Sequence, residues 1–323
     1  MIEGAFQGVF MLLTLILLGV FLTRAGLVTL EMEEKLARLT LLVFIPCNLF
    51  QTSISYMSAG LLRDMGHVLW LPFAVMLVGY LLGYPISSLA KIKSNNRGLF
   101  RVMFALSNSI FIGLPVCLSI FGERSMPLVT IYFFGNTLIF WTAGAKGIAS
   151  DAGKKYPIGL KAVANIFSPP LIGSLLGAAL AIANIQLPKF LQSSISYLGG
   201  MNVPVSLLLT GAVLSHMGKD LFRLGREATL TLAGRLLVQP FLMLAACMLF
   251  LHLGLMDNLD SALVIGVFVL ESSMPVMNQS LLLSKVYGAN ENLAAQSLIL
   301  TTLASMAWIP ILVFLLEVAL GGG

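Results

Sequence analysis

Charged residues are scarce in this chain. Asp, Glu, Lys and Arg make up only 10% of its 323 residues, whereas they make up about a quarter of ordinary soluble domains. Long hydrophilic stretches are also missing, because the largest gaps between apolar runs, at residues 24–35, 147–162 and 217–227, have the length of ordinary connectors. These shortages leave little room for a soluble domain. With a hydrophobic share of 58%, they indicate a membrane protein.

Cysteines and metal-binding motifs are equally few. Each of the three cysteines, Cys47, Cys117 and Cys247, lies inside an apolar run, where an isolated cysteine usually acts as a small packing residue. The sequence contains neither CxxC nor HExxH, so we expect no disulfide framework, metal site or cofactor. Paired aspartates or a Ser/His arrangement within the apolar runs do not stand out either. An intramembrane enzyme or a sensor is therefore a remote alternative, and we expect no enzyme.

Long apolar runs are what the chain does have. A helix needs about 20 mostly apolar residues to cross the hydrocarbon core of a bilayer. On that measure the sequence predicts ten spans, at about residues 4–23, 36–56, 68–90, 99–121, 126–146, 163–184, 196–216, 228–252, 260–284 and 293–317. We therefore expect an all-α membrane protein.

Lysine and arginine are distributed unevenly among the predicted connectors. Of the 19 such residues, 16 belong to odd-numbered connectors and their flanks, and the even-numbered connectors hold only Arg63, Arg124 and Lys189. Since basic residues collect on the cytoplasmic side, both termini should lie outside. This distribution also explains the net charge of +5 without a nucleic-acid partner. A miscounted span would destroy the alternation, which supports the count of ten.

The two halves of the chain show the order expected of an inverted repeat. Five spans per half place the halves in opposite orientations. Short similar segments recur in the same order in both halves, pairing Pro46 with Pro204, Pro115 with Pro275, Ile120 with Val286, and Trp141 with Trp308.

Two spans carry a proline within small and polar residues, in SNSIFIGLPV (107–116) and ESSMPVMNQS (271–280). Proline removes a backbone donor and clashes with the preceding turn, so a helix there is kinked or broken. Paired interruptions in the two halves of a membrane protein point to a transporter's substrate site. We predict that spans four and nine break at Pro115 and Pro275 and cross near the bilayer midplane, with Gly113 beside the first break.

Amide side chains near these breaks are candidate substrate ligands, because polar groups inside a membrane are costly. Asn108 and Asn278 should lie near the crossing, and Asn136, Asn48 and Gln51 could complete a polar pocket. Half-helix N-termini pointing there would offer N–H groups and partial positive charge to an anion. The alternative is that these amides only join helices by hydrogen bonds.

Two ionisable residues also fall within predicted spans. Glu271 lies one turn before Pro275. Because burial penalises an ionised carboxylate, it is a candidate carrier of a proton or cation, unless it stays neutral or binds freed backbone N–H groups. Arg235 could attract an anionic substrate, pair with Glu271, or extend to the cytoplasmic interface.

At these residues the chain resembles the auxin efflux carrier family, which includes plant PIN-type auxin exporters and bacterial malate or malonate permeases. The resemblance runs essentially end to end. It is carried by the segments FIPCNLF (44–50), NSIFIGLP (108–115), NVPVSLLLTGAVL (202–214) and SSMPVMNQSLLLSKVYG (272–288).

The resemblance implies a fold similar to that of sodium/proton antiporters and bile-acid symporters, with ten helices, inverted five-helix repeats and crossing broken helices four and nine. The family's crossover prolines carry over to Pro115 and Pro275, and its asparagine before the first crossover to Asn108. Its polar residue on helix five carries over to Asn136, within one position. Glu271 departs from the family, where a small or neutral residue is expected.

The resemblance also divides the chain into a scaffold and a transport domain. Residues 1–66 and 163–226 would form the scaffold, residues 67–146 and 227–323 the transport domain, and residues 147–162 a cytoplasmic linker. Substrate would bind between the two parts and be exposed to each side in turn by an elevator-like displacement. The short linker favours a compact, bacterial-type member in the inner membrane.

The sequence therefore predicts a secondary transporter for a small organic anion such as a carboxylate. The main alternative keeps the fold but makes the protein a cation/proton antiporter with Glu271 as carrier. Coupling to protons or sodium, and a homodimer through the scaffold, both stay open.

Overall fold

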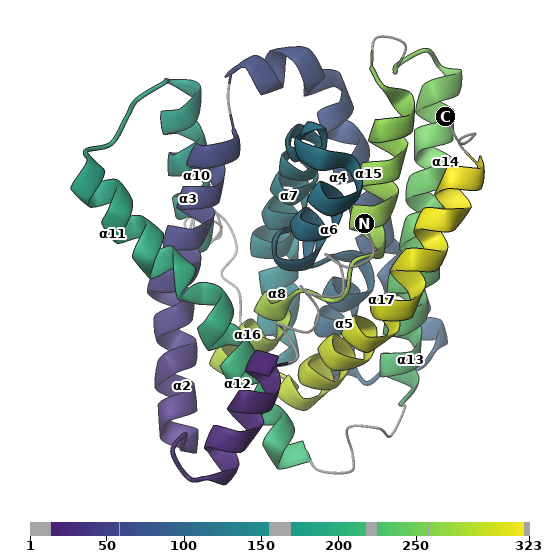
Figure 1. The fold of residues 1–323 in the computed structure, drawn as a ribbon. Coiled ribbons are helices and arrows are strands. Elements are labelled where there is room, and N and C mark those ends of the chain that lie inside the picture. Colours follow the sequence, from purple (N-terminus) through teal and green to yellow (C-terminus); the bar gives the residue numbers. More distant parts are fainter. Residues whose placement is uncertain (1–13, 58, 155–168, 218–224, 257–258, 320–323) are drawn as a thin grey trace.

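The computed structural model describes residues 14–57, 59–154, 169–217, 225–256 and 259–319, which are almost entirely helical (Figure 1). Within them, six helices are long and apolar enough to cross a membrane: Leu30–Tyr56, Val68–Leu89, Val116–Asp151, Lys189–His216, Arg226–His252 and Glu291–Leu316. Three shorter apolar helices are Thr14–Arg24, Pro169–Ile182 and Ser261–Ser273. The all-helical fold is confirmed. The count of ten spans and the inverted repeat stay predictions, since spans one and six extend into residues outside the described ranges.

Several rods combine α-helix with one wide π-helical turn. One rod contains α2 (Leu30–Leu39), η1 (Thr40–Phe44) and α3 (Ile45–Tyr56), and another contains α13 (Arg226–Ala233), η7 (Gly234–Val238) and α14 (Gln239–His252). In both rods the wide turn ends two residues before a proline, Pro46 or Pro240. A proline ring clashes with the carbonyl of the preceding turn, and a π turn changes that spacing. The local sequence thus explains why these rods continue through their prolines.

Other helices complete the described fold. They are α4 (Ala59–Leu89), α7 (Met126–Ile139) continued by η5 (Phe140–Gly144) and α8 (Ala145–Asp151), α10 (Pro169–Ile182), α11 (Lys189–Gly200), α12 (Asn202–Met217) and α17 (Glu291–Ala319), with short 3-10 turns η2 (Ser94–Asn96) and η4 (Gly122–Ser125). The helix of predicted span five thus continues to Asp151, into residues predicted as linker. The rest of that linker, from residue 155, lies outside the described residues.

Two groups of helices lie side by side in Figure 1. One contains α2, α3, α10, α11 and α12, and the other contains α4 to α8, α13 to α15 and α17. In the first group α10 packs closely on α3, since neither Gly173 nor Gly177 has a side chain. A Cβ at these positions would overlap the backbone carbonyl of Pro46 or Phe50, respectively. The groups contain the helices assigned above to scaffold and transport domain. Their division into a fixed and a moving part stays a prediction.

Two helices of the second group are interrupted. α5 (Arg97–Ala105) ends at an extended segment, Leu106–Asn108, after which η3 (Ser109–Gly113) and α6 (Leu114–Phe121) continue. Similarly, α15 (Ser261–Ser273) is separated by Met274–Met277 from α16 (Asn278–Tyr287). Ser107 and Val276 form an antiparallel bridge, and the Asn108 N–H donates to the Pro275 carbonyl at 2.8 Å. The two interruptions therefore touch.

The first interruption differs in position from the sequence-based prediction. The second lies at Pro275, as expected, but the first precedes Pro115 by about two turns. Pro115 is the second residue of α6, directly after a π turn. Near a helix start the missing N–H of proline costs little, so Pro115 does not itself break the helix.

Candidate functional site

The extended segments of both interruptions are held by polar side chains from neighbouring helices. Asn136 of α7 accepts from the Ser107 N–H at 3.3 Å and donates to the Ser107 carbonyl at 2.6 Å. Thr301 of α17 accepts from the Val276 N–H at 3.1 Å. Backbone groups that a helix would have satisfied thus find partners. Asn136 supports the backbone of the break, in line with the alternative that amides join helices.

Thr301 was not among the predicted site residues. It lies in a long apolar helix, where a threonine ordinarily hydrogen-bonds within its own helix, and it also donates to the Ser297 carbonyl at 2.7 Å. The only sequence signal for it is the pair of threonines, Thr301 and Thr302, in an apolar span near the position that corresponds to Asn136 in the other half.

Arg235 caps the C-terminal ends of both interrupted helices. Its guanidinium donates to the carbonyl of Ala105, the last residue of α5, at 2.9 Å, and to that of Ser272, near the end of α15, at 2.6 Å. Two further bonds, at 3.0 and 2.9 Å, reach the Met274 carbonyl. A helix C-terminus has free carbonyls and partial negative charge, which a buried cation with several donors satisfies well.

This geometry bears on all three predictions for Arg235. The side chain is fully buried, so it does not extend to a membrane surface. It forms no ion pair with Glu271 among the described residues. Its hydrogen bonds go to backbone carbonyls, so a direct role in attracting substrate stays untested.

The N-terminal ends of the two following half-helices are not capped in this way. Neither η3, which leads into α6, nor α16 has a side-chain hydrogen bond at its N-cap. Asn108 precedes η3 and Asn278 begins α16, and the Asn108 Nδ2 donates to the Asn278 Oδ1 at 3.4 Å. The Asn278 Nδ2 is buried and has no partner among the described residues. The two predicted amides therefore meet at two helix starts that lack side-chain caps, and one of their amide donors, the Asn278 Nδ2, is free among the described residues.

A small cavity lies beside these amides. Its free volume is about 20 Å³, roughly enough for one water molecule. The polar residues that line it are Asn48, Ser107, Asn108, Ser109, Asn136, Thr137 and Gln279, and the apolar ones are Leu49, Ile110, Phe133, Trp141 and Met277. Asn48 and Leu49 come from α3 in the first group of helices, whereas the other lining residues come from the second group and α16. The cavity thus lies where the two groups face each other.

Of the five predicted substrate ligands, the structure brings four together. Asn48, Asn108 and Asn136 line the cavity, and Asn278 is bonded to Asn108. Gln51 does not line it; its Nε2 donates to Ser55 on the same helix at 3.2 Å, and its buried Oε1 has no partner among the described residues. Sequence reasoning missed Gln279, whose buried Oε1 has no partner among the described residues. Its position next to Asn278 was the available signal.

Glu271 occupies a closed position on α15. It is fully buried, and a Cβ at Gly113 would overlap both of its carboxyl oxygens. The Cys117 thiol donates to its Oε1 at 3.6 Å. Gly113 and Cys117 belong to η3 and α6, so the absence of a side chain at Gly113 is what lets the carboxyl fit between the half-helices. Among the described residues no group of three or more His, Cys, Asp or Glu could hold a metal ion.

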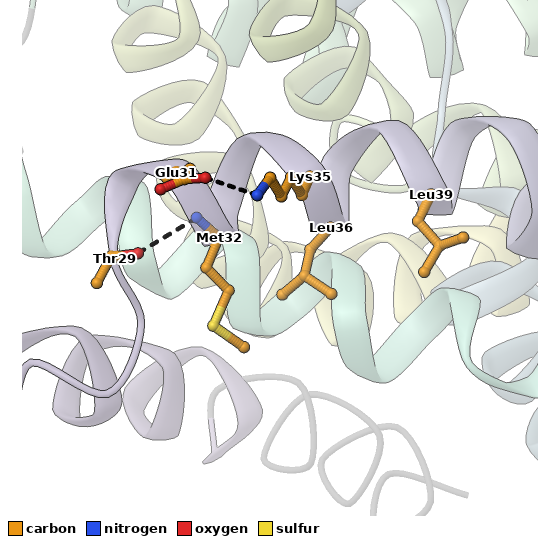
Figure 2. Close-up of a pocket in the computed structure, with 6 residues that line it drawn as sticks. All are labelled: Thr29, Glu31, Met32, Lys35, Leu36 and Leu39. Carbon is orange, nitrogen blue, oxygen red and sulfur yellow. Dashed lines mark hydrogen bonds and ion pairs between the residues drawn. The ribbon is translucent and has the colours of Figure 1, made fainter.

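A separate hollow lies on the outer surface of α2 (Figure 2). Its lining comes from a single stretch: Thr29, Glu31, Met32, Lys35, Leu36 and Leu39. Thr29 caps α2 by accepting from the Met32 N–H at 3.3 Å, and Glu31 pairs with Lys35 at 2.6 Å. These polar groups already have partners, and the pair is exposed to solvent. The hollow therefore lacks the free, buried donors seen at the amide site.

The family to which this architecture belongs is decided by comparison with known proteins. A family model described as membrane transport protein matches residues 5–158 and 158–313. The chain belongs to this family. The resemblance to auxin efflux carriers is thereby confirmed, and family membership identifies the chain as a membrane transport protein.

Individual proteins similar to this chain are also named as transporters. The chain is 28% identical over 317 residues to an uncharacterized transporter of Methanothermobacter thermautotrophicus, covering 95% of this chain and 97% of that protein. It is also 28% identical to an uncharacterized transporter of Methanocaldococcus jannaschii, covering 92% and 94%. A provisionally assigned malonate transporter of Rhizobium meliloti is 27% identical over 217 residues, or 66% of this chain and 65% of that protein.

Proposed function

We propose that this protein is a secondary transporter for a small organic anion with at least one carboxylate group. The supporting observation is that side chains cap the C-terminal ends of the interrupted helices but not the N-terminal ends of the half-helices that follow. Arg235 satisfies the C-terminal carbonyls of α5 and α15, whereas the N-termini of η3 and α16 carry no side-chain cap. Backbone N–H groups without side-chain caps and partial positive charge at two adjacent helix starts favour an anion there.

The amides add direction to this site. Asn108 and Asn278 offer N–H donors beside the two helix starts, and the unpartnered Asn278 Nδ2 is one donor that a carboxylate oxygen would accept. A dicarboxylate such as malonate is the first substrate to test, since malonate is the solute named for the Rhizobium meliloti relative. Asn136 is a weaker candidate for binding the carboxylate directly, because its amide already bonds the Ser107 backbone. Asn48 lines the cavity from α3 and stays a candidate.

Transport by an elevator-like displacement is the second part of the proposal. The cavity beside the amides is far smaller than a dicarboxylate, and its walls come from both groups of helices. Entry of substrate therefore requires the groups to move relative to each other. The distribution of Lys and Arg supports odd-numbered connectors in the cytoplasm and both termini outside.

Uptake by proteoliposomes tests the function. We expect the purified protein to exchange internal for external radiolabelled malonate. Asn108→Ala should lower this exchange at least about tenfold, the effect of losing roughly 1.4 kcal/mol of binding. Gln192→Ala, which removes an exposed amide from α11, is the matched control and should behave as wild type.

The antiporter alternative makes a different prediction for the same vesicles. An antiporter would move cations under an imposed sodium or proton gradient with no organic anion present. Cation movement under those conditions, combined with no exchange of malonate or other carboxylates, would contradict the proposed function.

A further inference from the structure

We infer that Glu271 is a proton-binding site, so that the ion moved together with the organic anion is a proton rather than a metal cation. The inference deepens the proposed function and rests on it. Glu271 binds one proton on a carboxyl oxygen when the site is open to one side of the membrane. It releases that proton to water when the site is open to the other side.

The carboxyl group of Glu271 is isolated from polar partners. Glu271 has no solvent exposure, and its only side-chain hydrogen bond among the described residues is the long contact from the Cys117 thiol. Its Oε2 has no partner there at all. A buried carboxylate without a cation or strong donors is costly. A proton removes the charge and leaves a neutral group that fits this apolar position.

The charged and titratable groups near Glu271 come from α6, η7 and α7. Cys117 faces it from α6, and the cation of Arg235 in η7 and the phenol of Tyr132 in α7 act on it electrostatically. Arg235 forms no ion pair with it, because the guanidinium is bound to carbonyls of Ala105, Ser272 and Met274. No titratable side chain described on α14, α17 or η3 is bonded to Glu271. No neighbouring side chain therefore neutralises the Glu271 carboxylate through an ion pair, and this role is left to a proton.

The ligands beside Glu271 bear on the type of ion. Hard cations such as sodium require several oxygen ligands. Among the described residues the one side chain bonded to Glu271 is a thiol, which is a soft ligand, and the adjoining Gly113 has no side chain to offer. A proton needs only one oxygen, and Glu271 supplies it.

Glu271 is connected to the amide site through the two half-helices. It lies on α15, three residues before Met274, where the segment that leads into Asn278 begins, and Gly113 closes the π turn that begins after Asn108. The same pair of half-helices thus carries the anion site and the carboxyl. A negative charge on Glu271 would oppose an anion at that site. Protonation of Glu271 therefore favours binding of the anion, and the bound anion favours protonation of Glu271 by the same factor.

Two measurements on the full-length protein in proteoliposomes test this inference. The first is malonate exchange at equal pH on both sides, which needs no net proton movement. The second is net malonate accumulation under a one-unit pH difference with the membrane potential held at zero, where each coupled proton supports about tenfold accumulation. We expect Glu271→Gln, a neutral analogue of the protonated form, to keep the exchange and to lose the accumulation and its pH dependence.

Matched variants separate coupling from folding. Glu123→Gln, at an exposed carboxyl between α6 and α7, should accumulate malonate as wild type does. Gly113→Ala, which displaces the Glu271 carboxyl, should resemble Glu271→Gln, and it serves as the test if Glu271→Gln is not recovered in folded form. Accumulation of wild-type size and pH dependence in Glu271→Gln overturns the inference, as does wild-type accumulation driven by sodium instead of protons. Absence of exchange of malonate and of other carboxylates in the wild type instead contradicts the proposed function itself.

Discussion

At the scale of single residues, Arg235 is the side chain on which the candidate site depends most. Its planar guanidinium joins three carbonyls from two interrupted helices, which no other described side chain does. Lysine carries the same charge but lacks the fork of donors that reaches several acceptors at once. The charge alone would not hold both helix ends.

Arg235→Lys should therefore lower the stability of the folded protein by about 2 kcal/mol or more, because buried carbonyls lose charged hydrogen bonds. The measurement is thermal unfolding of the purified protein in detergent. Arg226→Lys is the control, since Arg226 also donates to one carbonyl, that of Ala90, but at the protein surface. Equal melting temperatures for Arg235→Lys and Arg226→Lys would show that capping by Arg235 contributes little.

The role of Arg235 also shows where sequence reasoning stops. Asn108 and Asn278 were predicted to meet, because each lies near a proline in a corresponding half of the chain, and the structure brings them within hydrogen-bond distance. The partners of Arg235 lie more than 30 residues away in either direction and are backbone carbonyls, which every residue possesses. Their proximity exists only after both helices have broken and converged. Nothing in the local sequence marks it.

At the scale of elements, a partly buried ion-pair cluster links α2 and α12 of the first group to α16 and α17. Glu33 of α2 is fully buried and accepts from the Lys285 ammonium of α16 at 2.6 Å. Lys285 also contacts Glu291 of α17 at 3.2 Å, and His216 of α12 lies 3.1 Å from Glu33. If α2 and α12 stay fixed while α16 and α17 move, this cluster has to open in each transport cycle.

The ion pair should persist through neutral and moderately alkaline pH. Burial by itself lowers the pKa of Lys285, which lies just beyond predicted span nine, but the hydrogen bond to Glu33 and the charge of Glu291 outweigh burial and raise the pKa above its usual value. A raised folded-state pKa contributes stability that is present below the unfolded value and lost as pH rises through the folded value. The contribution of Lys285 should therefore disappear only at strongly alkaline pH.

Lys285→Met should destabilise the protein by about 3 kcal/mol, since it leaves the buried carboxylate of Glu33 without its main partner. Removing both charges in Glu33→Gln with Lys285→Met should recover most of that loss. Thermal unfolding of the two single variants and the double variant measures the coupling as a double-mutant cycle. Additive losses would mean that the two residues do not interact across the groups of helices.

The positions of elements were easier to predict than their interruptions. The apolar runs predicted where the described helices end to within about five residues, because hydrophobic length is a local property of the sequence. The starts of α2, α4 and α11 lie six to nine residues before the predicted spans. The first interruption was placed at Pro115 but lies at Leu106–Asn108. A proline in the first turn of a helix is tolerated, and the actual break depends on backbone pairing with Val276 and on Asn136, which lie far away in the chain.

At the scale of the whole molecule, the parts fit one arrangement. Two groups of helices face each other across a cavity with room for about one water molecule, and the amides at two open helix starts lie beside it. The negative ends of the interrupted helices are neutralised by Arg235, while the positive ends remain available. We therefore expect the amide site to accept a negatively charged carboxylate.

Calorimetric titration of the purified protein with malonate tests that claim most directly, through the sign of the charge at Asn278. Asn278→Asp keeps the shape of the side chain but replaces a donor with a negative charge, and Asn95→Asp makes the same change on an exposed turn. We predict that the wild type and Asn95→Asp bind malonate alike and that Asn278→Asp binds at least about tenfold more weakly, a loss of roughly 1.4 kcal/mol. Equal affinity of Asn278→Asp and the wild type would contradict the account.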